Sequence, residues 1–218
     1  MTYWTRFIVG VALFIPFYAI GEYFAVHKAF SFLIANVGAI GIHIPNFYVM
    51  HFGSDLKKIE KALFSNRVVP LYNFILASSN RDDKEVEFCI EALLNRYKSR
   101  SKQALFKTLH AAYKEELLTV KEEIKLITPA KSQYFYQALV CIEEGNIIEA
   151  EKYINLIDKP VTKNILKIEL MLKVGQLAEA YQLSLQTLEQ AKGIQKYTIY
   201  KSIETYFPMF IDQHKQVI

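Results

Sequence analysis

The pattern of charged and apolar positions divides the chain into two parts near residue 54. Residues 7–21 and 29–54 contain no Asp, Glu, Lys or Arg, whereas nearly all charged residues follow residue 54. About twenty apolar residues are enough to cross the hydrocarbon core of a bilayer. The pattern therefore predicts a transmembrane helical hairpin in residues 1–54, with spans at 3–26 and 29–52.

The remaining residues, 55–218, have the pattern of an all-helical domain. No strand-like alternation occurs there, and helix-forming residues dominate. Asp82 and Glu85 have the spacing of a helix-starting capping box, and apolar positions recur at helical spacing after them. A nearly continuous apolar stripe from Leu105 to Ile127 predicts one longer helix, which either pairs as a coiled coil or packs against neighbouring helices. The predicted fold class is all-α.

Two six-residue segments in the second half of this domain repeat each other. Gly145 begins one and Gly175 the other, and each ends in Glu-Ala, at Ala150 and Ala180. A glycine closes a helix in a left-handed turn, and a small alanine lets the next helix pack closely against it. We therefore expect positive φ at both glycines and burial of both alanines.

This joint resembles that of the tetratricopeptide repeat (TPR) family, in which a turn glycine is followed by an acidic residue directly before an alanine. Tyr134 and Ala138 also match the aromatic and small positions of the family, although the period here is thirty residues and not 34. The resemblance covers about sixty residues and implies an α-solenoid of helix-turn-helix repeats. The expected units are repeats at 129–158 and 160–192, earlier diverged units within 82–127, and a capping helix at 194–210.

The resemblance also implies a binding surface. Solenoids of this family bind protein partners on a concave face formed by the first helix of each repeat. Most of the inward positions here are apolar, and the basic clamp that some family members use for peptide carboxylates is absent, so the partner should offer an apolar helix or extended segment. The expected contact positions are Ser132, Phe135, Leu139, Ile142, Thr162, Ile165, Glu169 and Leu172.

The distribution of charge orients the hairpin. Net charge is only +4, too small to indicate a nucleic-acid partner. A basic cluster follows the second span, and by the positive-inside rule it places both termini and the helical domain in the cytoplasm. The same residues, Lys57, Lys58, Lys61 and Arg67, are expected to contact anionic lipid.

The second span is more polar than a simple anchor requires. Asn36, Gly38, Gly41 and His43 are expected to line its contact with the first span or with a second copy of the chain. An alternative makes His43 a proton-relay residue or haem ligand, since His51 falls on the same helical face. The first span has its own alternative, a cleaved signal peptide ending at the small-residue triplet that starts at Ala19. Aromatic residues expected at the membrane interface are Tyr3, Trp4, Tyr23, Phe47, Tyr48 and Phe52.

No catalytic, cofactor or metal-binding motif occurs in the sequence. Cys89 and Cys141 lack a CxxC partner and lie among apolar residues, which indicates two reduced core cysteines. A basic stretch from Arg96 to Lys107 is expected to be a solvated loop at a helix junction. Contact with the inner leaflet, and after it with nucleic acid, are the alternatives.

These observations favour a non-enzymatic function. The leading hypothesis is a membrane-anchored adaptor or scaffold of the cell membrane, whose cytoplasmic TPR-like domain binds a protein partner without a cofactor, a metal or nucleic acid. The alternative is an accessory subunit of a transporter, secretion or protease complex, with the polar second span as its main contact.

Overall fold

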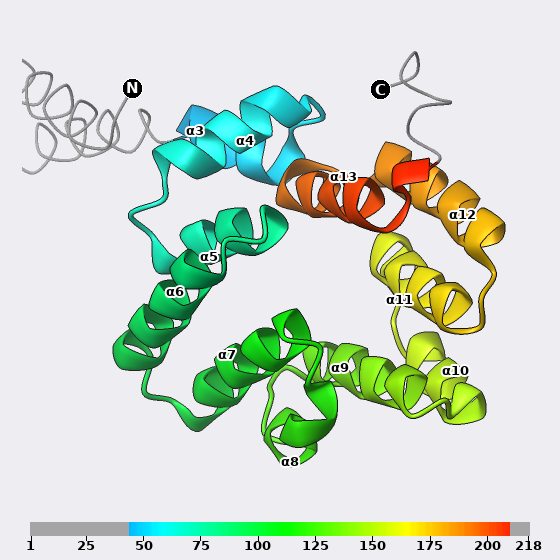
Figure 1. Ribbon diagram of the computed structural model, residues 1–218. Helices are drawn as coiled ribbons and strands as arrows, with labels where there is room; N and C mark the ends of the chain where they lie inside the picture. Colours follow the sequence, from blue (N-terminus) through cyan, green and yellow to red (C-terminus); the bar gives the residue numbers. More distant parts are fainter. Residues whose placement is uncertain (1–43, 210–218) are drawn as a thin grey trace, which may run out of the picture.

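The structure is a computed structural model that describes residues 44–209, and within this range it is all-helical (Figure 1). The predicted all-α class and helical-repeat packing are confirmed for this range. Five helices line the inside of a ring: α5 (Pro70–Ser79), α7 (Arg100–Tyr113), α9 (Ala130–Glu143), α11 (Pro160–Lys173) and α13 (Gly193–Tyr206). The outer helices are α3 (Ile44–Phe52), α4 (Leu56–Ser65), α6 (Asp83–Arg96), α8 (Lys121–Ile124), α10 (Ile147–Asn155) and α12 (Leu177–Gln190).

A thirty-residue period sets the positions of the inner helices. α5, α7, α9 and α11 begin at residues 70, 100, 130 and 160. Proline occupies the first position of α5 and α11, where its missing N–H is not needed and its fixed φ favours the helix. The period that the sequence reveals in two copies therefore extends over four helical pairs.

The joint between inner and outer helices is the same in all four pairs. The turning residues Arg81, Glu115, Gly145 and Gly175 have φ of 55°, 61°, 73° and 83°. The N–H that follows each of them donates to a carbonyl five residues back, as Asn146 does to Cys141 at 2.8 Å and Gln176 to Met171 at 2.9 Å. This is the Schellman closure of a helix. The positive φ expected at Gly145 and Gly175 is confirmed.

Burial at the glycine joints also agrees with the sequence prediction. Ala150 and Ala180 are fully buried. Ala150 packs with Cys141 and Ile142 of the preceding helix, and Ala180 packs with Ile168 of its own preceding helix. A larger residue at either alanine would separate the two helices of the pair.

The prediction of one long helix from Leu105 to Ile127 is wrong. α7 ends at Tyr113, the chain turns through Glu115, and a 3₁₀ turn at Leu117–Val120 leads into α8. The N–H of Glu116 donates to the carbonyl of Ala111 at 2.7 Å and closes α7. The apolar stripe persists because Leu117, Ile124 and the residues of α7 pack in one shared core.

Other local predictions are confirmed. The Asp82 carboxylate accepts from the N–H of Glu85 at 3.2 Å and caps α6. Cys89 and Cys141 are free and buried. The basic stretch falls at a helix junction as expected, but only residues 97–99 form a loop there, and Arg100, Lys102 and Lys107 lie on α7.

The last inner helix closes the ring. α13 packs against α12 on one side and against α3, α4 and α5 on the other (Figure 1). Tyr197 of α13 is buried with Met50, Ile59 and Leu63 of the first two described helices. The helix predicted at 194–210 corresponds to α13, which contacts α4 as well as α12.

Close backbone contact fixes this closure. The N–H of Gly193 donates to the carbonyl of Gly53 at 2.7 Å. A Cβ at Gly193 would lie 2.1 Å from the carbonyl oxygen of Met50, so only glycine fits there. The hydroxyl of Tyr197 donates to Glu60 at 3.2 Å across the same contact.

The predicted membrane hairpin lies almost entirely outside the described residues. Within residues 44–209, no helix is long and apolar enough to cross a bilayer. Of the predicted second span, the structure describes only α3, which packs against α4 and α13.

Candidate functional sites

The inward positions expected from the TPR resemblance divide into three groups. On α9, Phe135 and Leu139 pack against the cores on both sides of the helix, and Ile142 is buried. Ser132 and Thr162 are half-buried. The other three positions, Ile165, Glu169 and Leu172, line a small pocket of about 100 Å³ together with α12 and α13.

A second pocket, of about 240 Å³, lies where α5, α7 and α13 meet. Arg81 and Glu115, the two turning residues with positive φ that are not glycine, both line it. Positive φ is unfavourable for residues with a side chain, and such strain is enriched at functional sites. Ten of the eleven residues around the pocket are polar: Ser78, Ser79, Arg81, Tyr113, Glu115, Thr198, Lys201, Ser202, Thr205 and Tyr206.

Electrostatic effects link these two pockets. Burial raises the pKa of Tyr206, the negative charges of Glu169 and Glu115 raise it further, and Arg81 opposes the shift. Burial alone raises the pKa of Glu169. On the neighbouring helix, burial also raises the pKa of Glu143, although the positive charge of Lys173 opposes this. Tyr206 and Glu169 line the smaller pocket together, and Tyr206 lines the larger one as well. The ring interior thus holds charges of both signs together with many hydroxyl groups.

The guanidinium of Arg81 has a specific environment. It lies 5.8 Å from the centre of the Tyr113 ring. The Tyr113 hydroxyl donates to Asp83 at 2.5 Å, and burial together with that bond raises the pKa of Tyr113 to about 12. Tyr113 therefore stays a neutral donor at physiological pH. This pocket suits a polar group better than an apolar one.

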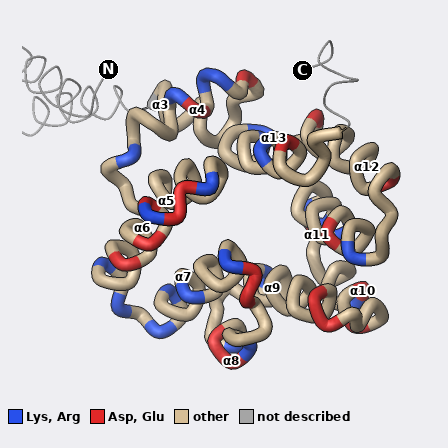
Figure 2. The backbone as a smooth tube through the Cα atoms, viewed as in Figure 1, with Lys and Arg blue, Asp and Glu red and all other residues tan. Residues whose placement is uncertain are grey.

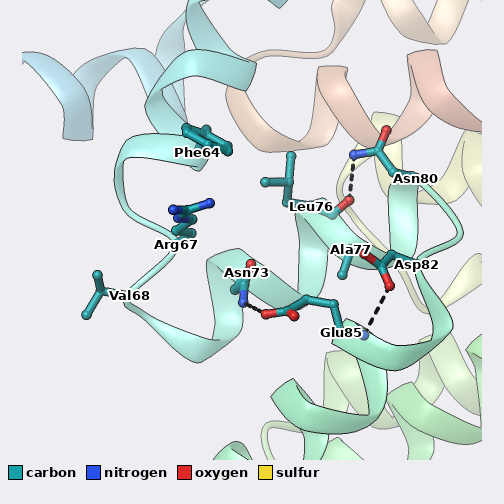
Figure 3. Close-up of a pocket in the computed structure, with 9 residues that line it drawn as sticks. All are labelled: Phe64, Arg67, Val68, Asn73, Leu76, Ala77, Asn80, Asp82 and Glu85. Atoms are coloured by element: carbon teal, nitrogen blue, oxygen red, sulfur yellow. Dashed lines mark hydrogen bonds between the residues drawn. The ribbon is translucent and has the colours of Figure 1, made fainter. Parts of the chain in front are cut away.

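A third hollow, of about 480 Å³, lies between the end of α4 and the pair α5–α6 (Figure 3). Phe64 and Val68 form its apolar side, and the guanidinium of Arg67 lies 4.5 Å from the centre of the Phe64 ring. Asn73 and Glu85 are on the opposite side, where the Asn73 amide donates to the Glu85 carboxylate at 2.5 Å (Figure 3). We call this hollow the α4–α6 groove.

Apolar side chains at the groove are unusually exposed. Val68 is 68% exposed and Phe64 is 54% exposed. Asn80 and Asp82 line the groove further along. The Asn80 amide donates to the Leu76 carbonyl, and the Asp82 carboxylate caps the start of α6. Apolar surface bordered by polar residues is typical of sites that bind other proteins or membranes.

The sequence contains a signal for this groove that helical repeats alone do not reveal. Ile59, Ala62 and Leu63 form the buried face of α4, whereas Phe64 falls outside that stripe. Val68 follows in the connection to α5, where a large apolar residue has no helical face to bury it. Apolar residues that break the stripe of an amphipathic helix therefore indicate such a surface.

All four predicted lipid-contacting residues are exposed: Lys57, Lys58, Lys61 and Arg67. Three of them lie on α4, next to the uncharged α3 (Figure 2). Asp55 caps α4 by accepting from the N–H of Lys58 at 3.1 Å, and this bond lowers the pKa of Asp55. The cluster remains predominantly basic.

The predicted contact residues within the second span are Asn36, Gly38, Gly41 and His43, and they lie outside the described residues.

Comparisons with known proteins identify no relative. No family model matches the chain, and neither a curated protein nor a solved structure matches it.

Proposed function

We propose that this protein is a membrane-anchored, non-enzymatic adaptor whose helical ring binds a protein partner at the α4–α6 groove. The observation that supports this most is the exposure of Phe64 and Val68 beside a hollow with a polar opposite wall. Binding sites of this kind combine apolar contact area with a few polar groups that fix orientation.

The chemistry of the groove limits what the partner presents. Phe64 and Val68 offer exposed apolar area, so the partner segment should carry apolar side chains along one of its sides. An amphipathic helix or an extended segment meets that requirement. Asp82 and Glu85 add acidic groups on the far wall, where a donor of the partner would be favoured.

Anchoring belongs to the same proposal. The uncharged N-terminal part of the chain would hold the ring at the cell membrane, with both termini in the cytoplasm. The basic residues of α4 and Arg67 would then lie near the inner leaflet, where anionic lipids attract them.

A photo-crosslinking experiment tests the partner site. A photoreactive amino acid replaces Val68 in the full-length chain in cells, and a matched control replaces Ile148, which is 75% exposed on α10. The expected result is a discrete crosslinked protein from position 68 that is absent from position 148. The double variant Phe64→Ser and Val68→Ser should lose that partner during mild purification, whereas Ile148→Ser should retain it.

Two outcomes contradict the proposal. Equal crosslinking from positions 68 and 148 would mean that the groove is not the site. Loss of the partner when residues 30–43 are exchanged for a generic apolar helix would support the accessory-subunit alternative. That exchange ends before α3, because α3 packs against the ring and must remain.

A further inference from the structure

The two faces of α3 have opposite environments. Met50 is buried, and with Val49 it packs against α4 and α13. Phe47, Tyr48 and Phe52 are 55%, 61% and 55% exposed, and His51 is exposed beside them. Positions i, i+1, i+4 and i+5 share one side of a helix. We call these four residues the aromatic face of α3.

The side chains of the aromatic face pack against one another in pairs. The Phe47 and His51 rings lie 4.2 Å apart between centres, and the Tyr48 and Phe52 rings lie 5.5 Å apart. More than half of each of Phe47, Tyr48 and Phe52 is exposed, so in water they form an apolar surface. A surface of this kind marks a contact with another phase or another protein.

Three observations identify the lipid bilayer as the occupant of this face. Residues 29–43, which directly precede α3, contain no charged side chain. Aromatic side chains concentrate at the boundary between hydrocarbon and water. The neighbouring α4 carries exposed Lys57, Lys58 and Lys61, which complement anionic head groups, whereas α3 carries no Lys, Arg, Asp or Glu (Figure 2).

We propose that the aromatic face of α3 lies in the bilayer interface and holds the ring against the membrane in one fixed orientation. This proposal rests on the proposed membrane anchoring. It adds a fixed orientation, because α3 is packed against the ring and is not a flexible linker. Its opposite face is packed in the contact that closes the ring, where Gly193 hydrogen-bonds Gly53 at 2.7 Å. The edge formed by α3 and α4 therefore faces the bilayer, and α8 and α10 lie farther from it (Figure 1).

This orientation specifies where a partner approaches. The α4–α6 groove begins at the end of α4, so it opens close to the membrane surface. A segment of another membrane protein that emerges from the bilayer would reach the groove more readily than a freely diffusing protein would.

Fluorescence quenching by brominated lipids tests the proposal. The chain has a single tryptophan, Trp4, which is replaced by Phe in the full-length protein. Separate reporters are then introduced as Phe47→Trp and Phe52→Trp, with Ile148→Trp on α10 as the control. Each protein is reconstituted into phosphatidylcholine and phosphatidylglycerol vesicles, with and without bromine on the upper acyl chain.

The expected result is a loss of most of the fluorescence at positions 47 and 52 in brominated vesicles and no loss at position 148. Unquenched reporters at 47 and 52 in vesicle-bound protein would overturn the proposal. So would a blue-shifted but unquenched spectrum, which would mean that residues 1–43 or a second copy cover the face. If the protein did not float with the vesicles at all, the proposed anchoring itself would fail. Partner crosslinking at position 68 is scored separately.

Discussion

The four joints of the ring have the same hydrogen bonds but two kinds of turning residue. Gly145 and Gly175 adopt positive φ at little cost, whereas Arg81 and Glu115 adopt it against the steric preference of a side chain. Arg81 and Glu115 both line the polar pocket between α5, α7 and α13. Gly145 and Gly175 are exposed, and a Cβ at either would meet no atom within 4 Å. Helix packing thus requires a left-handed turn at each joint, and the residue at the turn determines only how much conformational free energy that turn costs.

The largest expected effect on stability is at Ala150 and Ala180, the buried alanines five residues after the two turn glycines. Ala150→Phe or Ala180→Phe should lower the free energy of unfolding by about 1 to 3 kcal/mol, because overpacking a filled contact forces the helices apart. Both alanines are fully buried. Denaturant unfolding followed by circular dichroism measures the change. Ala178→Phe, on the exposed side of the same helix α12, is the control, and equal loss in that variant would contradict the assigned packing.

Breaking a glycine joint should have the next largest effect. Gly145→Val should lower the free energy of unfolding by about 1 to 2 kcal/mol, since a β-branched residue strongly disfavours positive φ. A Cβ at this position meets no atom within 4 Å, so the loss should come mainly from the backbone conformation. Gly145→Asn, which tolerates this conformation better, should lose clearly less. Similar losses for Val and Asn would argue against the left-handed turn.

Converting a charged joint into a glycine joint should give a smaller effect of opposite sign. Glu115→Gly should raise the free energy of unfolding by about 0.5 to 1 kcal/mol, because relief of the strain exceeds the entropy that glycine adds to the unfolded chain. Arg81→Gly should gain less, because it also removes the contact with the Tyr113 ring at 5.8 Å. A marked loss of stability in Glu115→Gly would show that the Glu115 side chain stabilises the pocket.

The smallest expected effect is on the pH dependence of stability. It concerns Glu169, whose carboxyl group acts on Tyr206 in the ring interior. Burial raises the pKa of Glu169 above its ordinary value of 4.5, so the folded protein keeps this proton to higher pH than the unfolded chain does. Stability therefore falls as pH rises from about 4.5 through the raised pKa. Glu169→Gln should be more stable than the parent at pH 7 and closely similar at pH 4. Thermal melts at both values check this, and a constant difference between the two would contradict a buried acid.

The sequence predicts the glycine joints and not the charged ones for a physical reason. Gly145 and Gly175 are visible because glycine is the residue that favours a left-handed turn. Glu115 lies thirty residues before Gly145, so the period alone would have located it, but its apolar neighbours also fit one continuous helix. Arg81 does not lie thirty residues before Glu115, because α5 has ten residues whereas the other inner helices have fourteen.

The binding surfaces were harder to predict than the fold. The positions on α9 expected from the TPR resemblance pack into the cores between α9 and its neighbouring helices. Phe64 and Val68 belong to no repeat, and only their failure to fit an amphipathic stripe indicates them. Closure of the ring depends on contacts between residues 137 positions apart, such as Tyr197 and Glu60, which no local pattern encodes.

Energy transfer between α4 and α13 tests ring closure most directly. Dyes are attached at Lys61→Cys and Lys192→Cys, two exposed positions, while the native cysteines stay unlabelled because burial raises the pKa of Cys89 to about 11 and also raises that of Cys141. α4 contacts α13 and is only about 15 Å long, so transfer should be nearly complete. Gly193→Val, which places a side chain against the Met50 carbonyl, should reduce it. Low transfer in the parent protein, as an open solenoid with separated ends would give, would contradict a closed ring.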